Sequence, residues 1–198
     1  LSFGAWPASE TSTEVRLIRS NVLKHHRWSE YELLSPEAYR LPPVVTQPEG
    51  PNSKPAKRVV LHILDQSEWE RTNDWIKRAR GETDAAATND KSAPADEADF
   101  EAFLQMCQEP GTCHVLFAPR GIGTTEWTRN ERERTHIRRR FALLGQTDDS
   151  ARVWDTRRAI QAIRTLPEIS QVPLTINGRS RAAGWGLYAS LSEPPVAA

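Results

Sequence analysis

The stretch VPLTINGRSRAAG, residues 172–184, changes character abruptly along its length. Its first part, Val172 to Ile176, is an apolar run of the kind that forms a buried strand. Small residues follow, with Gly178 two positions before Ser180 and Ala182 two positions after it. A strand that turns sharply into a helix needs small side chains there, because the two backbones nearly touch. The stretch therefore predicts a strand, a tight turn at Ser180 and a helix.

A serine at such a turn has two interpretations. The spacing Gly-x-Ser-x-Gly, here with Ala in the last place, holds a hydroxyl above the edge of the sheet, where free N–H groups of the following helix could stabilise an oxyanion. Serine is also a common N-cap, and a pattern this short arises often by chance. Both interpretations stay open on this pattern alone.

Two more apolar runs, Val59 to Leu64 and Cys113 to Phe117, predict strands that are covered on both faces. From residue 59 onward the predicted order is strand, helix, strand, helices, strand, helix. This alternation favours parallel strands with helices on both sides. We predict an α/β fold with a mostly parallel sheet flanked by helices.

Capping and periodicity place the helices. Ser67 with Glu70 indicates a capping box for a helix that ends before Gly81. Asp149 or Ser150 is expected to cap a later helix. The apolar positions of three helices follow a helical period, and they are Phe100, Phe103, Leu104 and Cys107, then Ile137, Phe141 and Leu144, then Val153, Ile160 and Ile163.

The chain divides into an N-terminal extension with a β-hairpin at 1–58 and a core at 59–198. Residues 82–95 hold little that could be buried, and we expect them to form an exposed, mobile insertion. The helix from about Asn130 to Leu144 is crowded with arginine. It is either a site for an acidic partner or a solvated face, and the neutral composition of the chain favours the solvated face.

Composition narrows the function classes. The chain of 198 residues has 26 basic and 26 acidic side chains, which argues against nucleic-acid binding through overall charge. It lacks an apolar run long enough to span a membrane. Cys107 and Cys113 are close enough in sequence to form a disulfide, or they are reduced and buried. The spacing of cysteine and histidine does not suggest a zinc site, and we expect neither a metal nor a cofactor.

The chain as a whole resembles the N-terminal half of an α/β-hydrolase of the acetyl xylan esterase and prolyl-oligopeptidase-related branch. The resemblance covers roughly residues 30 to 193 and rests on the order of several motifs. These motifs are Leu33-Leu34-Ser35-Pro36 with Leu41-Pro42, the strand Val59 to Leu64, Pro119-Arg120-Gly121-Ile122-Gly123, Arg152-Val153-Trp154-Asp155, the turn at Ser180, and Leu187-Tyr188-Ala189.

The resemblance implies a carboxylic-ester hydrolase, with an acetylated carbohydrate as the first substrate to test. Ser180 would be the nucleophile, and the backbone N–H groups of Arg181 and of Gln66 or Ser67 would form the oxyanion hole. Arg120 is expected to be a structural arginine. The compartment cannot be read from the chain, and a secreted or periplasmic location is favoured.

The sequence departs from the family in its catalytic partners. All five histidines precede Ser180, and the acid after it is Glu193. The family order of serine, acid and histidine is therefore incomplete. We expect this chain to be part of a longer hydrolase, whose missing C-terminal half or a second chain would cover the exposed edge of the strand Val172 to Ile176. The alternative is a binding module or scaffold that keeps the fold without a catalytic triad.

Overall fold

The computed structural model describes residues 14–35, 39–51, 53–82, 93–193 and 196–197. Its strands are β1 (Val15–Leu23), β2 (His26–Ser35), β3 (Tyr39–Leu41), β4 (Val44–Pro48), β5 (Arg58–Ile63), β6 (Thr112–Phe117), β7 (Leu174–Gly178) and β8 (Val196–Ala197). Its helices are α1 (Gln66–Arg80), α2 (Ala93–Cys107), α3 (Glu131–Leu143), α4 (Asp148–Thr165) and α5 (Ser180–Ser190), with a short 3-10 turn at Gly123–Thr125.

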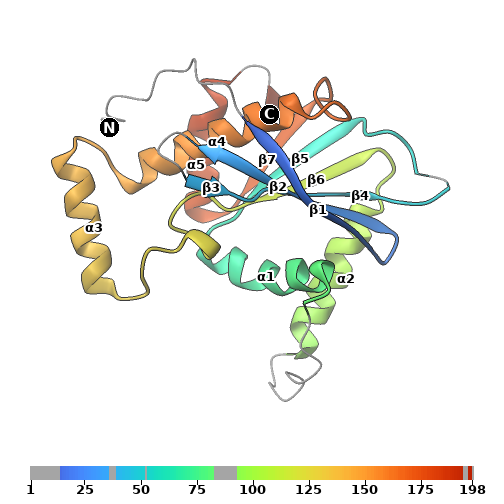
Figure 1. The fold of residues 1–198 in the computed structure, drawn as a ribbon, viewed down its shortest axis with the longest axis horizontal. Helices are drawn as coiled ribbons and strands as arrows, with labels where there is room; N and C mark the ends of the chain where they lie inside the picture. The colour runs from blue at the N-terminus through green and yellow to red at the C-terminus, as the bar shows by residue number, and fades with distance from the viewer. Residues whose placement is uncertain (1–13, 36–38, 52, 83–92, 194–195, 198) are drawn as a thin grey trace.

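All strands join one mixed sheet in the order β1-β2-β4-β6-β5-β7-β8, with β3 paired to β2. The N-terminal strands β1, β2 and β4 run antiparallel to their neighbours, whereas β5 pairs in parallel with β6 and β7. The predicted parallel arrangement therefore holds from residue 58 onward. In Figure 1, α1 and α2 cover one face of the sheet and α4 and α5 cover the other, as an α/β fold requires.

The hydrophobic core explains why each element forms where it does. On β5, the side chains of Val59, Leu61 and Ile63 are buried, and every residue of β6 is buried. The predicted apolar positions of α2 and α4 are buried as well. Helices therefore protect both faces of the parallel half of the sheet, which is why its strands read as continuous apolar runs.

Two helix caps differ from the prediction. Asp65, not Ser67, is the N-cap of α1, and Glu68 completes the capping box. Thr147, not Asp149 or Ser150, is the N-cap of α4, with Ser150 as its capping-box partner. In both cases several neighbouring residues have side chains that can act as N-caps, and the residue at which the helix begins determines which of them does so. The C-terminal end of α1 is as predicted, because Gly81 adopts a left-handed conformation there.

The helix α3 lies apart from the sheet, at the left of Figure 1. None of its residues is buried, and Leu144 just after it is 74% exposed. The solvated interpretation of this segment therefore agrees with the structure. Its main aromatic contact joins Phe141 to Trp127, with ring centroids 5.4 Å apart.

The N-terminal extension and the insertion are only partly described. The hairpin partner strands pair as predicted, with Leu33 opposite Leu41. Most of the predicted mobile insertion at 82–95 lies outside the described residues, although residues 93–95 belong to α2. No helix among the described residues is long and apolar enough to cross a membrane.

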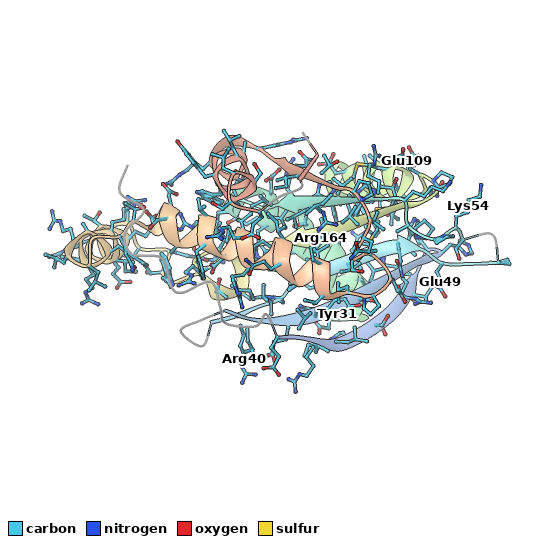
Figure 2. All side chains as sticks on the ribbon, turned by 90° about the horizontal axis from the view of Figure 1, so that it is seen from above. Tyr31, Arg40, Glu49, Lys54, Glu109 and Arg164 are labelled. Atoms are coloured by element: carbon cyan, nitrogen blue, oxygen red, sulfur yellow. The ribbon has the colours of Figure 1, made fainter. Side chains whose placement is uncertain are left out.

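The edge strand β7 is better covered than the sequence predicts. Leu174 and Thr175 pair in parallel with the short strand β8. In the loop between α4 and β7, the guanidinium of Arg164 donates to the carbonyl oxygens of Ser170 (3.1 Å) and Val172 (2.6 Å). Figure 2 shows Arg164 on α4, which lies across the sheet. These bonds fix the loop that leads into β7.

Candidate active site

The turn between β7 and α5 places Ser180 in an unusual backbone conformation. Ser180 is the first residue of α5 and has a φ of +48°. The only other described residues except glycine with positive φ are Lys24 and His25, in the turn between β1 and β2. A left-handed conformation costs a residue with a Cβ about 1 to 2 kcal/mol. Such strain is concentrated at functional sites, where the surrounding structure imposes it.

Gly178 allows this turn because strand and helix approach closely. A Cβ built on Gly178 would lie 2.9 Å from the carbonyl carbon of Ala182 and 3.0 Å from its oxygen. Ala182 itself is fully buried. The predicted need for small residues on both sides of Ser180 is thus confirmed at Gly178 and Ala182.

Free backbone N–H groups occur at the starts of both α5 and α1. The N–H of Ala182 donates to the carbonyl oxygen of Arg179, whereas the N–H of Arg181 has no acceptor among the described residues. The same holds for the N–H groups of Gln66 and Ser67 at the start of α1. These are the unsatisfied donors that every helix N-terminus presents.

Two pockets flank the turn. The first, which we call the arginine pocket, measures about 280 Å³ and is lined by Gln66, Arg181 and the inner side of α3. The second, the histidine pocket, measures about 340 Å³ and is lined by Gly178, Arg179 and His62. Gly178 and Arg179 therefore line the histidine pocket, and Arg181 lines the arginine pocket. The side chain of Ser180 itself is exposed.

The two arginines beside Ser180 are directed to carboxylates. Arg181 donates to both oxygens of Asp149, at 3.1 and 3.0 Å. The indole N–H of Trp185 donates to the same carboxylate at 2.9 Å. Partial burial opposes ionisation of Asp149, yet these bonds keep its pKa below its ordinary value. Arg179 is 72% exposed and lies 3.8 Å from Glu68.

The histidines near the site lie on neighbouring strands, where His114 is buried and His62 is partly exposed at the histidine pocket. His62 Nε2 and His114 Nδ1 are 3.0 Å apart, and the Asn177 amide donates to His62 Nδ1 at 3.2 Å. Burial lowers the pKa of His62 to about 3 and that of His114 to about 4. His62 is in register with Asn177, three residues before Ser180, and its ring nitrogens face His114 and Asn177. Among the described residues it forms no hydrogen bond with Ser180, so it is not positioned here as a base for that hydroxyl.

The structure assigns Arg120 to the scaffold, as predicted. Its backbone N–H and Nε both donate to Asp155 Oδ2 at 2.9 Å, and its Nη2 donates to Oδ1 at 2.7 Å. Both side chains are almost completely buried. A buried pair with this geometry fixes the loop after β6 against α4, because breaking it would leave an uncompensated charge.

The described residues hold no group of three or more side chains suited to a metal ion. Cys107 and Cys113 are both free and buried, so the reduced interpretation is the one that the structure shows. Burial raises the pKa of each thiol to about 12. Neither is a reactive thiolate at neutral pH.

Sequence reasoning missed the side chains that shape the arginine pocket. Arg152 of α4 lies over the rings of Trp127 and Trp185, with its Cζ 5.7 and 5.0 Å from their centroids. The sequence identified Arg152 only as part of a motif of the family resemblance and predicted no role for its side chain. Its neighbours come from three separate segments, so the sequence order did not reveal the cluster.

The strand order, the layers of helices and the turn at Ser180 define an α/β-hydrolase-type fold. Comparison with known proteins supports this fold assignment. No protein-family model and no curated protein sequence matches the chain. Solved structures do match, and several of them are carbohydrate esterases.

A proposed acetyl xylan esterase from Bacteroides fragilis matches 90% of this chain with a TM-score of 0.60 and 13% identity. A glucuronoyl esterase from Solibacter usitatus matches 96% with a TM-score of 0.56 and 17% identity. Acetyl xylan esterase 1 from Thermoanaerobacterium matches 94% with a TM-score of 0.53 and 14% identity. The match covers 46%, 51% and 51% of these three chains, so this chain spans about half their length.

Proposed function

We propose that this chain carries the nucleophile of a carboxylic-ester hydrolase, with Ser180 as the attacking residue. The observation that carries the proposal is the positive φ of Ser180 at the turn from strand to helix. A serine that served only as a helix cap would precede the helix in extended conformation, as Arg179 does here. Ser180 instead occupies the strained first helical position.

In the proposed reaction, Ser180 Oγ attacks the acyl carbon and its proton passes to a general base. The tetrahedral oxyanion would accept hydrogen bonds from the free N–H groups of Arg181 and Gln66. The oxyanion then collapses, and the alcohol leaves with the proton from the base. Water hydrolyses the acyl-enzyme by the same steps, which releases the acid and restores the serine.

The general base and its carboxylate partner lie outside the site described above. We propose that they come from polypeptide that extends the sheet beyond β7, either a missing C-terminal half or a second chain. Among the described residues, β8 pairs with Leu174 and Thr175 of β7. The adjacent outer face of α5 exposes Leu187, Tyr188 and Leu191. An open strand edge beside exposed apolar side chains is a typical site for added polypeptide.

The proposed substrate is a small-molecule or carbohydrate ester. The fold neighbours named above include an acetyl xylan esterase and a glucuronoyl esterase, and this analogy of fold favours carbohydrate esters. The chemistry at Ser180 requires neither a metal nor an organic cofactor.

One observation favours the alternative, a scaffold or binding module without catalysis. No histidine among the described residues lies within hydrogen-bond distance of Ser180. Without a base, the hydroxyl would stay a weak nucleophile.

Labelling with a fluorophosphonate probe separates the two functions. The protein expressed from its entire reading frame should form a covalent adduct, and peptide mass spectrometry should locate this adduct at Ser180. The matched control is Ser180→Ala, which should not react. A folded wild-type protein that fails to react would establish the scaffold and exclude the esterase.

A further inference from the structure

The arginine pocket contains charged side chains that an oxyanion hole does not require. Four arginine side chains line it, from three helices: Arg134 and Arg138 of α3, Arg152 of α4 and Arg181 of α5. Its lining includes Gln66 and Arg181, whose backbone N–H groups are the proposed oxyanion donors. A ligand in this pocket would therefore lie beside the proposed oxyanion hole.

The carboxylates that face these arginines are already engaged. Asp65 accepts from the hydroxyl of Ser67 and from the backbone of Glu68 as the cap of α1. Asp148 accepts from Arg152 at 3.2 Å and lies 4.0 Å from Arg138. Behind the lining, Arg134 bonds to Glu126, Arg138 to Glu131 and Arg181 to Asp149.

Arg152 differs from the other three arginines because it is both buried and immobilised. Its side chain is 9% exposed, and the indoles of Trp127 and Trp185 lie against its guanidinium. Its Nε donates to the carbonyl oxygen of Arg120 at 3.2 Å, and its Nη1 donates to Asp148. Its Nη2 has no acceptor in the described part of the chain.

A guanidinium in this state is prepared for an anionic oxygen ligand. Desolvation lowers the pKa of Arg152, and the nearby carboxylates only partly offset this effect. Its orientation is fixed before binding, so little side-chain entropy is lost when a ligand accepts from Nη2. Arg138 of α3, which is 47% exposed and approaches the same Asp148 oxygen as Arg152, can contribute a second cation.

From these contacts we infer that the arginine pocket binds a carboxylate, so that the ester cleaved at Ser180 belongs to an acid-bearing molecule such as a uronic acid sugar. That the bound molecule is a substrate rests on the proposed function. That the pocket binds a carboxylate does not. The carboxylate would accept from Arg152 Nη2, while the ester group would lie toward Arg181 and Gln66. The indole edges of Trp127 and Trp185 would face the remainder of the ligand.

A matched pair of sugars tests the inference without turnover. Galacturonate and galactose differ in one carboxylate, and each is titrated into the ¹⁵N-labelled 198-residue chain. The indole N–H resonances of Trp127 and Trp185 report binding. Galacturonate should shift both resonances saturably, and galactose should shift neither. Equal shifts from both sugars, or none from galacturonate, would overturn the inference.

Substitutions then locate the carboxylate. Arg152→Gln should weaken galacturonate binding about tenfold or more, since a charge-assisted hydrogen bond is lost. Arg138→Gln should weaken it severalfold, and this exposed position decides the matter if the Arg152 variant does not fold. Arg139→Gln, on α3 but outside the pocket lining, is the matched control and should leave affinity unchanged. Equal affinities in all three variants would contradict the inference.

The two proposals can fail separately. A chain that binds galacturonate but does not react with a fluorophosphonate keeps the carboxylate site and loses the esterase. A chain that reacts at Ser180 but does not distinguish the two sugars keeps the esterase and loses the carboxylate site.

Discussion

At the scale of single residues, the site depends on backbone geometry more than on side-chain contacts. Ser180 is exposed and its hydroxyl has no hydrogen-bond partner in the described part of the chain. What distinguishes it is a φ of +48°, which residues with a Cβ rarely adopt. The protein therefore tolerates strain at the position where a nucleophile would be needed.

Replacing Ser180 with Gly should remove this strain. We expect Ser180→Gly to raise the free energy of unfolding by about 1 kcal/mol, because glycine adopts positive φ without steric cost. Ser180→Ala keeps the Cβ and should leave stability within about 0.5 kcal/mol of wild type. Urea unfolding of the three proteins measures the difference. Equal stability of the Gly and Ala variants would show that the turn is not strained.

The two glycines on either side of Ser180 provide a second comparison. Gly178→Ala should destabilise the protein by about 1 to 3 kcal/mol, because the added methyl meets the backbone of Ala182, which cannot move aside. Gly184→Ala lies inside α5, where the added methyl would meet no atom of another element within 4 Å, and should stabilise by about 0.5 to 1 kcal/mol. Thermal unfolding should shift in opposite directions for the two variants, and a shift in the same direction would contradict the close approach at Gly178.

At the scale of elements, parallel strand pairing brings His62 of β5 and His114 of β6 together. Their rings stack with centroids 5.3 Å apart, in contact with Phe103 of α2. Both imidazoles are neutral near pH 7, since burial lowers their pKa values to about 3 and about 4. The stability contributed by this pair, of which His114 is buried and His62 partly buried, should therefore depend on pH.

The unfolded chain takes up protons on these histidines near their ordinary pKa of 6.5, whereas the folded chain does so only well below it. Stability from the pair should therefore be complete above about pH 6.5 and fall as the pH drops toward 4. The expected slope is about 1 kcal/mol per pH unit for each histidine. Urea unfolding between pH 7 and pH 5 measures it.

The double variant His62→Gln with His114→Gln provides the control for this slope. It should be less stable at pH 7 but should lose less stability on acidification. A wild-type slope no steeper than that of the double variant would mean that the pair does not titrate as proposed.

The sequence predicted these elements well and their contacts poorly. Apolar runs at 59–64 and 113–117 matched β5 and β6 closely, because strands covered by helices on both faces carry a strong local signal. The run at 172–176 overlaps β7, which begins and ends two residues later and has one buried residue. The contact between His62 and His114 could not be predicted, since it depends on the strand order and not on local pattern. Caps failed at Ser67 and Asp149 because neighbouring polar residues compete for one position.

The site shows the same division. The close approach at Gly178 and the turn at Ser180 were readable from small-residue spacing. The arginine pocket was not, because its walls come from α1, α3, α4 and α5. A helical period in α3 also gave no warning that Ile137 and Phe141 would lie outside the core.

At the scale of the whole molecule, the described residues leave part of the sheet edge at β7 unpaired. β5 pairs with five residues of β7, and the described residues of β8 pair with two of them on the other side. The fold neighbours are about twice as long as this chain. The same end carries Leu187 and Leu191, which are 62% and 75% exposed on α5. Edge backbone and apolar side chains together form the surface at which we expect added polypeptide to pack.

This expectation predicts how the chain behaves by itself. The 198-residue chain should associate with increasing concentration, because the described residues leave part of the β7 edge and the apolar side chains of α5 uncovered. Leu187→Glu with Leu191→Lys should raise the monomer fraction in sedimentation velocity. The matched control, Leu143→Glu with Leu144→Lys, alters exposed leucines at the end of α3, a helix that lies apart from the sheet in Figure 1. If the α3 variant dissociates the chain and the α5 variant does not, the association surface lies on α3, and the proposed source of the catalytic base beyond β7 loses its structural support.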